Sequence, residues 1–206
     1  MNRACLKIGV LGSGTGTNLQ SIIDAVAAGR VKAKIACVIS DVQTAFILER
    51  ARKHGVDALY VPPGKYKTRL SPAAEADYIR VLKEREVELV VLAGFMRMLK
   101  GDFLEAFPNR VINIHPSILP AFRGLEAWKQ ALDYGVKFTG CTVHFVELGM
   151  DTGPIIMQAV VEVKDDDTPQ TLHQRIQVEE HRIYPEVIRL IAEGRVEPRG
   201  RRVFIR

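Results

Sequence analysis

An asparagine and a histidine stand two positions apart in the segment Asn113-Ile114-His115-Pro116-Ser117. In an extended chain, residues i and i+2 point to the same face, so both side chains can project into one pocket. An amide NH₂ and an imidazolium are both hydrogen-bond donors. Together they can hold the oxyanion that develops on a carbonyl under attack, so the pair predicts a site for addition to a carbonyl group.

A carboxylate that could serve the same site is Asp151, in the turn Asp151-Thr152-Gly153-Pro154. Beside His115 it would favour the protonated imidazole and could relay a proton through water. Taken singly, each residue also has a structural interpretation, because His115 ends a strand and Asp is common in turns. Ser117 does not stand in a G-x-S-x-G elbow, and no Cys/His spacing indicates a metal, so neither a hydrolase triad nor a metal centre is expected.

The glycine-rich segment Gly12-Ser13-Gly14-Thr15-Gly16-Thr17-Asn18 lies between an expected strand and an expected helix. Backbone amides at a helix N-terminus bind phosphate, and small residues let the backbone approach it closely. Thr17 stands where a dinucleotide fingerprint has its third glycine, although Asp41 could act as the ribose-binding acid, and no lysine follows as in a Walker loop. The segment predicts a phosphate-binding loop, with a tight turn that binds nothing as the alternative.

The last expected helix carries a polar stripe at i, i+4, i+7 and i+11, formed by His173, Gln177, Glu180 and Tyr184. Such a stripe usually marks a solvated face, but Glu180 could instead meet a cationic or amine-bearing substrate. The four histidines other than His115 are scattered along the chain and are interpreted as structural: His54, His144, His173 and His181.

Apolar runs alternate with helical patterns along the chain, which predicts an α/β fold with a mostly parallel central sheet and helices on both faces. Strands are expected over 7–11, 34–40, 58–61, 88–93, 110–114, 138–147 and 155–163, and helices over 19–29, 45–53, 71–86, 125–134 and 168–194. In open α/β sheets, ligands bind beyond the carboxyl ends of the strands. Both the glycine-rich loop and the Asn113–His115 pair fall at such ends.

The 206 residues, 47% hydrophobic and 26% charged, indicate one globular domain rather than a disordered or membrane-spanning chain. We expect a nucleotide-binding half over 1–100, a catalytic half over 101–194 and a solvated basic tail over 195–206. The tail holds five arginines and one glutamate, and therefore +4 of the net charge of +5. Cys5, Cys37 and Cys141 lie in apolar runs and predict reduced, buried thiols in a cytoplasmic protein.

Several segments together resemble the phosphoribosylglycinamide formyltransferases of purine biosynthesis. They occur in the family's order and cover nearly the whole chain: GTGTNLQ at 14–20, VVLAGFMRML at 90–99, VINIHPSILPAFRG at 111–124, TVHFV at 142–146, DTGPIIMQ at 151–158 and EEHRIYPEVI at 179–188. The resemblance implies a Rossmann-like formyltransferase fold. It also implies transfer of a formyl group from 10-formyltetrahydrofolate to the amine of glycinamide ribonucleotide, without a metal.

The same resemblance assigns residue roles, with Asn113, His115 and Asp151 as the catalytic residues. It implies that His115 is the general acid and that Asn113 binds the formyl oxygen. Asp151 would keep His115 protonated and order a water that carries away the amine proton. The implied ribonucleotide-binding residues are Gly16, Thr17, Asn18, Gln177 and Glu180. The implied folate-binding residues are Arg69, Met96, Arg97, Met98, Leu99, Asn113, Glu147, Leu148, Gly149, Met150 and Asp151.

We expect small-molecule substrates, no nucleic-acid or membrane partner, and a monomer or homodimer. Methionyl-tRNA formyltransferases also resemble residues 113–124 and 151–153, but they carry an additional C-terminal domain and lack the loop at 14–18. Formyltetrahydrofolate hydrolases share the three catalytic residues but have an additional N-terminal domain. Two alternatives from other classes are a nucleotide-binding module without catalysis and a dinucleotide oxidoreductase.

Overall fold

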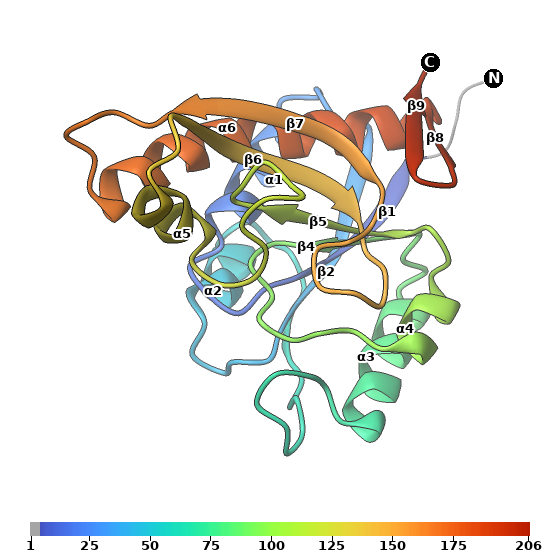
Figure 1. Ribbon diagram of the computed structural model, residues 1–206. Coiled ribbons are helices and arrows are strands. Elements are labelled where there is room, and N and C mark those ends of the chain that lie inside the picture. The colour runs from blue at the N-terminus through green and yellow to red at the C-terminus, as the bar shows by residue number, and fades with distance from the viewer. Residues whose placement is uncertain (1–4) are drawn as a thin grey trace.

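The computed structural model describes residues 5–206 and has a seven-stranded sheet at its centre, in the order β3-β2-β1-β4-β5-β6-β7 (Figure 1). The strands are β1 (Leu6–Leu11), β2 (Ala33–Ser40), β3 (Ala58–Tyr60), β4 (Leu89–Leu92), β5 (Val111–His115), β6 (Phe138–Phe145) and β7 (Ile155–Glu162). β1 to β5 pair in parallel, whereas β6 pairs antiparallel with both β5 and β7. The expected mostly parallel α/β sheet is confirmed.

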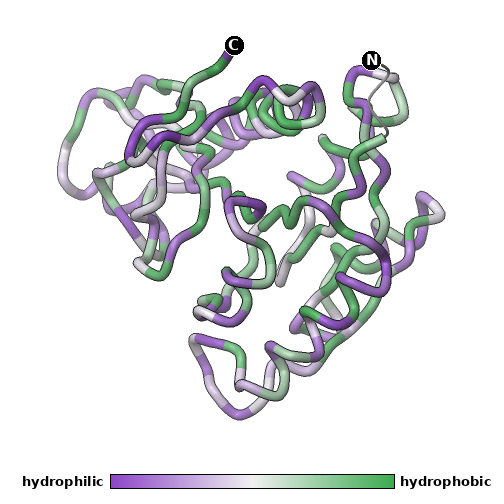
Figure 2. Tube along the Cα trace, turned by 90° about the vertical axis from the view of Figure 1, so that its right-hand side faces the viewer, coloured by the Kyte–Doolittle hydropathy of each residue, from purple (hydrophilic) through white to green (hydrophobic). Residues whose placement is uncertain are grey.

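Helices cover both faces of this sheet. They are α1 (Thr17–Ala27), α2 (Phe46–Lys53), α3 (Pro72–Glu84), α4 (Gly101–Ala106), α5 (Ala127–Tyr134) and α6 (Pro169–Ala192). Alternate strand residues enter two cores: Ile8 and Val10 of β1 pack with α1, α2 and α6, whereas Leu11 packs with α3 and α4. Burial on both faces explains why the strands are continuous apolar runs rather than alternating ones. Figure 2 shows these hydrophobic stretches through the middle of the molecule.

Two expected helix starts carry the predicted caps. The Ser71 side chain accepts a hydrogen bond from the Ala74 amide at 3.2 Å, and Thr168 forms a capping box with Thr171. Both helices have proline in the first turn, where its missing N–H costs nothing. α6 continues through Pro185 for 24 residues. No helix within residues 5–206 is both long and apolar enough to cross a membrane.

Two local features differ from the sequence expectations. The sequence does not predict the short helix α4, because six residues that begin with glycine carry little helical periodicity. Cys5 is exposed just before β1, so the prediction that it is buried is wrong. Cys37 and Cys141 are buried as expected, and burial raises the pKa of their thiols to about 11 and about 12.

The C-terminal segment is a β-hairpin rather than a solvated tail. β8 (Val196–Arg199) pairs antiparallel with β9 (Arg202–Ile205), and Val196 and Val203 pack against the core beside α6 (Figure 1). At the turn, the Arg201 guanidinium donates a hydrogen bond to the Thr152 carbonyl and lies 3.5 Å from the Glu147 carboxylate. The sequence does not predict this hairpin, because five arginines interrupt the valine and phenylalanine residues of its two strands.

Candidate active site

A cleft of about 640 Å³ lies beyond the carboxyl ends of β1, β4 and β5, where the fold class predicts a ligand. It is lined by the glycine-rich loop, the loop after β4, the end of β5, the loop after β6 and one face of α6. Every residue assigned above to catalysis or substrate binding lines this cleft except Arg69. Arg69 lies beside it, in a bridge with Met98, and its guanidinium covers the ring of Tyr66 at 4.1 Å.

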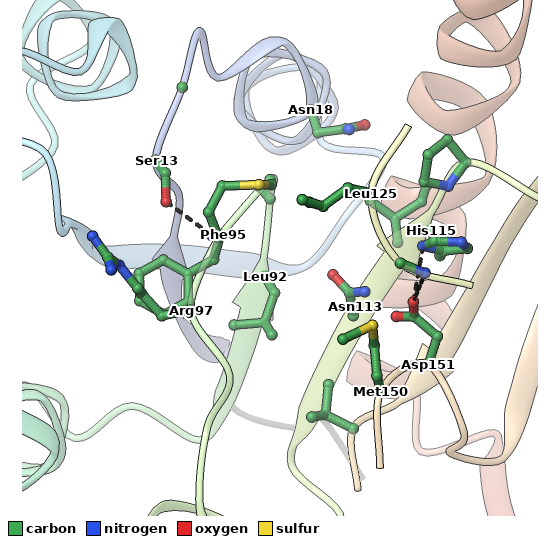
Figure 3. Close-up of a pocket in the computed structure, with 18 of the residues that line it drawn as sticks. Ser13, Asn18, Leu92, Phe95, Arg97, Asn113, His115, Leu125, Met150 and Asp151 are labelled. Carbon is green, nitrogen blue, oxygen red and sulfur yellow. Dashed lines mark hydrogen bonds and ion pairs between the residues drawn. The ribbon is translucent and has the colours of Figure 1, made fainter. Parts of the chain in front are cut away.

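The three expected catalytic side chains meet at one end of the cleft (Figure 3). Asn113 and His115 come from β5, and Asp151 comes from the loop between β6 and β7. Asp151 Oδ2 lies 3.3 Å from His115 Nδ1 and accepts a hydrogen bond from the Gly124 amide at 2.9 Å. The carboxylate therefore fixes both the imidazole and the loop that follows β5.

Both ring nitrogens of His115 face oxygen acceptors. Nδ1 faces Asp151, and Nε2 lies 2.8 Å from the carbonyl oxygen of Phe122. A neutral imidazole can donate only one of these two hydrogen bonds, whereas an imidazolium donates both. With only 5% of the residue exposed, the geometry suits a histidine that holds and delivers a proton.

His144 also lies in the site, although the sequence predicts only a structural role for it. It stands opposite Asn113 in the β5–β6 register, and its Nε2 lies 3.3 Å from Asn113 Nδ2. It also lies 3.7 Å from Asp151. Burial lowers the pKa of His144 and so favours the neutral ring. The antiparallel pairing of β5 with β6 brings it here, and only knowledge of that register could have revealed it.

The loop that carries Asp151 has a constrained backbone. Asp151 itself has a positive φ of 51°, a conformation that non-glycine residues adopt at a cost. A Cβ on Gly153 would lie 1.7 Å from the Phe145 carbonyl oxygen, so only glycine fits there. This tight return to β7 holds the Asp151 side chain over His115.

The N-terminus of α1 is open to a ligand. Its N-cap, Gly16, has a φ of 73°, no side chain caps the helix, and its first turn has no acidic residue. α3 and α6, by contrast, are capped by Ser71 and Thr168. The first N–H groups of α1 have no partner within the helix, and together with the helix dipole they favour a negatively charged ligand. A Cβ on Gly16 would lie 2.7 Å from Ile47, which explains the glycine.

Glu180 is buried rather than solvated, and burial raises its pKa to about 7. Its Oε2 accepts a hydrogen bond from Asn18 Nδ2 at 2.9 Å, while Asn18 Oδ1 has no partner within residues 5–206. Gln177 lines the cleft one turn earlier. Tyr184, the last member of the stripe, is fully buried and donates to the Leu92 carbonyl at 2.8 Å. The stripe therefore faces the cleft and the core.

Exposed apolar side chains surround the opening of the cleft: Met96, Leu125, Leu148 and Met150 are each more than half exposed. Figure 3 shows Leu125 and Met150 near Asn113. Such side chains suit a flat apolar ligand that the backbone of the neighbouring loops can also contact. No group of three or more His, Cys, Asp or Glu side chains within residues 5–206 is arranged to hold a metal ion.

The sheet order, the uncapped end of α1 and the cluster of Asn113, His115 and Asp151 together suit an enzyme that acts on a small carbonyl group. A family model described as formyl transferase matches residues 6–188. The phosphoribosylglycinamide formyltransferase of Bacillus subtilis is 41% identical over 183 residues, which cover 89% of this chain and 93% of that protein. This chain belongs to the formyl transferase family, and its resemblance to phosphoribosylglycinamide formyltransferases is confirmed.

A solved structure and a second relative support the same family. The crystal structure of glycinamide ribonucleotide transformylase 1 from Symbiobacterium toebii has a TM-score of 0.93 and 56% identity, and the match covers 97% of this chain and 93% of that one. The human trifunctional purine biosynthetic protein adenosine-3 is 42% identical over 93% of this chain. The chain spans only 19% of the length of that relative.

Proposed function

We propose that this chain transfers the formyl group of 10-formyltetrahydrofolate to the amine of glycinamide ribonucleotide in purine biosynthesis. The products are formylglycinamide ribonucleotide and tetrahydrofolate. The single observation that carries the proposal is the meeting of Asn113, His115 and Asp151 in a cleft that also contains the uncapped N-terminus of α1. The likeness to the Bacillus enzyme supports the substrate pair.

In this proposal the ribonucleotide phosphate binds the backbone amides of Gly16, Thr17 and Asn18. Gln177 and Glu180 face the glycinamide end, where Glu180 can accept a hydrogen bond from the neutral amine that attacks the formyl group. The folate binds along Met96 to Leu99, close to Arg69, and along Glu147 to Asp151. Residues 1–100 and 101–194 thus form the two halves of one domain, and each half contacts both substrates.

The reaction begins when the substrate amine attacks the formyl carbon, forming a C–N bond and an oxyanion. Asn113 Nδ2 donates a hydrogen bond to this oxyanion, and Nε2 of the protonated His115 donates to it in place of its hydrogen bond to the Phe122 carbonyl. Asp151 orients His115 and accepts the amine proton through a water. The intermediate collapses as the bond from the formyl carbon to N10 of the folate breaks, and N10 leaves with a proton supplied by His115.

We place the reaction in the cytoplasm, since Cys5, Cys37 and Cys141 are free thiols, as is usual in a reducing compartment. The test is an assay of the purified protein with both substrates, which follows tetrahydrofolate and the formylated ribonucleotide together. Equal amounts of the two products support the proposal. Tetrahydrofolate without the formylated ribonucleotide would indicate a hydrolase, and no turnover would indicate another amine or a binding module.

A further inference from the structure

Asp41, at the end of β2, is a buried acid that the proposed reaction does not use. Its carboxylate is 1% exposed and accepts hydrogen bonds from two side chains. Oδ1 lies 2.5 Å from Ser13 Oγ, in the glycine-rich loop, and Oδ2 lies 2.7 Å from Arg97 Nε, in the loop after β4. One carboxylate therefore joins the loop proposed to bind phosphate and the loop proposed to bind folate.

Two further contacts join the same loops. Ser13 Oγ accepts a hydrogen bond from the Met96 amide at 2.9 Å, shown as a dashed line in Figure 3, and the Ser13 amide donates to the Gly94 carbonyl at 2.9 Å. The Ser13 hydroxyl donates its one proton to Asp41 and accepts the Met96 N–H on one of its two lone pairs. Without Asp41 this hydroxyl has no fixed orientation, so the position of the Met96 amide depends on the acid.

Arg97 also joins the loop after β4 to a third segment, residues 66–67. Its guanidinium donates to the carbonyl oxygens of Tyr66 and Lys67 and lies opposite His115 and Asp151 in the close-up (Figure 3). The hydrogen bonds of the Arg97 side chain thus hold the end of β2 and residues 66–67 against the loop after β4. An ion pair this well buried, with hydrogen bonds on both partners, keeps a fixed geometry.

We infer that Asp41 is a positioning residue that joins the two substrate-binding loops into one unit, so that a ligand on either loop orders the other. This inference rests on the proposed function for the identity of the two ligands. Ordering by the first ligand lowers the entropy lost when the second one binds, which is positive coupling without a large movement. By linkage, each ligand must then raise the affinity for the other by the same factor.

The first measurement needs no ligand, so it separates this inference from the proposed reaction. Hydrogen exchange of the free protein should show faster exchange at residues 13–17 and 95–99 in Asp41→Asn than in the wild type. Asp57→Asn is the matched control, because Asp57 forms a 2.8 Å ion pair with Arg85 away from the cleft. Unchanged exchange at both loops in a folded Asp41→Asn protein would overturn the inference.

The second measurement is the Kd of glycinamide ribonucleotide with and without saturating tetrahydrofolate, by calorimetry. The wild type and Asp57→Asn should bind the ribonucleotide about 5-fold or more tightly with the folate present. In Asp41→Asn this ratio should fall to near one. Ser13→Ala, which leaves the Asp41–Arg97 pair in place, should lose the coupling with little change in Tm. A ratio near one in the wild type, or an undiminished ratio in folded Ser13→Ala, contradicts the inference.

Discussion

Asn113 and His144 face each other across the β5–β6 pair, with Nδ2 of the amide 3.3 Å from Nε2 of the imidazole. The other nitrogen of His144, Nδ1, lies 2.7 Å from the Phe145 carbonyl oxygen and must donate to it. In the neutral ring, Nε2 is then an acceptor, and the Asn113 amide donates to it. His144 thereby fixes which way the Asn113 amide faces, and the second N–H of the Asn113 amide remains for a substrate oxygen.

We predict that His144→Ala lowers kcat about 10–100-fold, because the Asn113 amide loses its fixed orientation. His144→Gln, whose amide oxygen can accept the same hydrogen bond, should retain more activity. The matched control is His54→Ala, since His54 is exposed and away from the cleft, and it should behave as the wild type. Equal turnover by His144→Ala and the wild type, in steady-state assays, would show that Asn113 needs no such partner.

Asn113→Ala and His115→Ala should each lower kcat by about 10²–10³, because each removes one donor to the oxyanion. KM should change little if these donors act only in the transition state. Circular dichroism and thermal unfolding check that both variants are folded. Near wild-type turnover in both would exclude the proposed mechanism.

Asn18→Ala should act on binding rather than on chemistry. Its side chain donates to Glu180 inside the cleft, and its backbone lies in the first turn of α1. We expect KM for the ribonucleotide to rise while kcat and KM for the folate change less. A rise confined to KM of the folate would show that the two subsites have been exchanged.

The pH dependence of stability should carry a signature of Glu180. Burial raises its pKa to about 7, above the usual value of 4.5 that applies to the unfolded chain. Between these values the unfolded carboxyl has lost its proton while the folded one keeps it, so stability falls as pH rises through this window. Urea unfolding at pH 5 and pH 8 should therefore show a loss on the order of 3 kcal/mol attributable to this group.

Glu180→Gln keeps the acceptor for Asn18 but cannot ionise, so its free energy of unfolding should fall less between pH 5 and pH 8. Glu179→Gln is the matched control, because this neighbour pairs with Arg182 at the outer side of the helix. It should reproduce the pH dependence of the wild type. Identical curves for Glu180→Gln and the wild type would mean that Glu180 ionises normally in the folded protein.

The sequence predicts the strands and most helices because their apolar patterns are local. Burial on both sheet faces makes β4 a continuous apolar run, and Ser71 and Thr168 mark helix starts directly. The shared orientation of Asn113 and His115 also follows from strand geometry. Their meeting with Asp151 depends on chain segments far apart in sequence, so only the family resemblance predicts it and residue spacing does not.

Other features could not be predicted because they depend on tertiary register. His144 enters the site only through its pairing with Asn113. Asp41, considered as a ribose-binding acid, instead bonds Ser13 and Arg97. The arginines of the C-terminal hairpin suggest a solvated segment, whereas its valines pack against the core.

That hairpin leads to a last prediction, because Arg201 contacts the loop that carries Asp151. Its guanidinium donates to the carbonyl of Thr152, the next residue, and lies 3.5 Å from Glu147. Arg201→Ala should raise KM for the folate about 2–10-fold, the range expected for one hydrogen bond, and leave KM for the ribonucleotide unchanged. Arg199→Ala is the control, since Arg199 pairs with Glu197 within the hairpin. If Arg201→Ala and Arg199→Ala raise KM for the folate equally, the contact of Arg201 with the Asp151 loop does not contribute to folate binding.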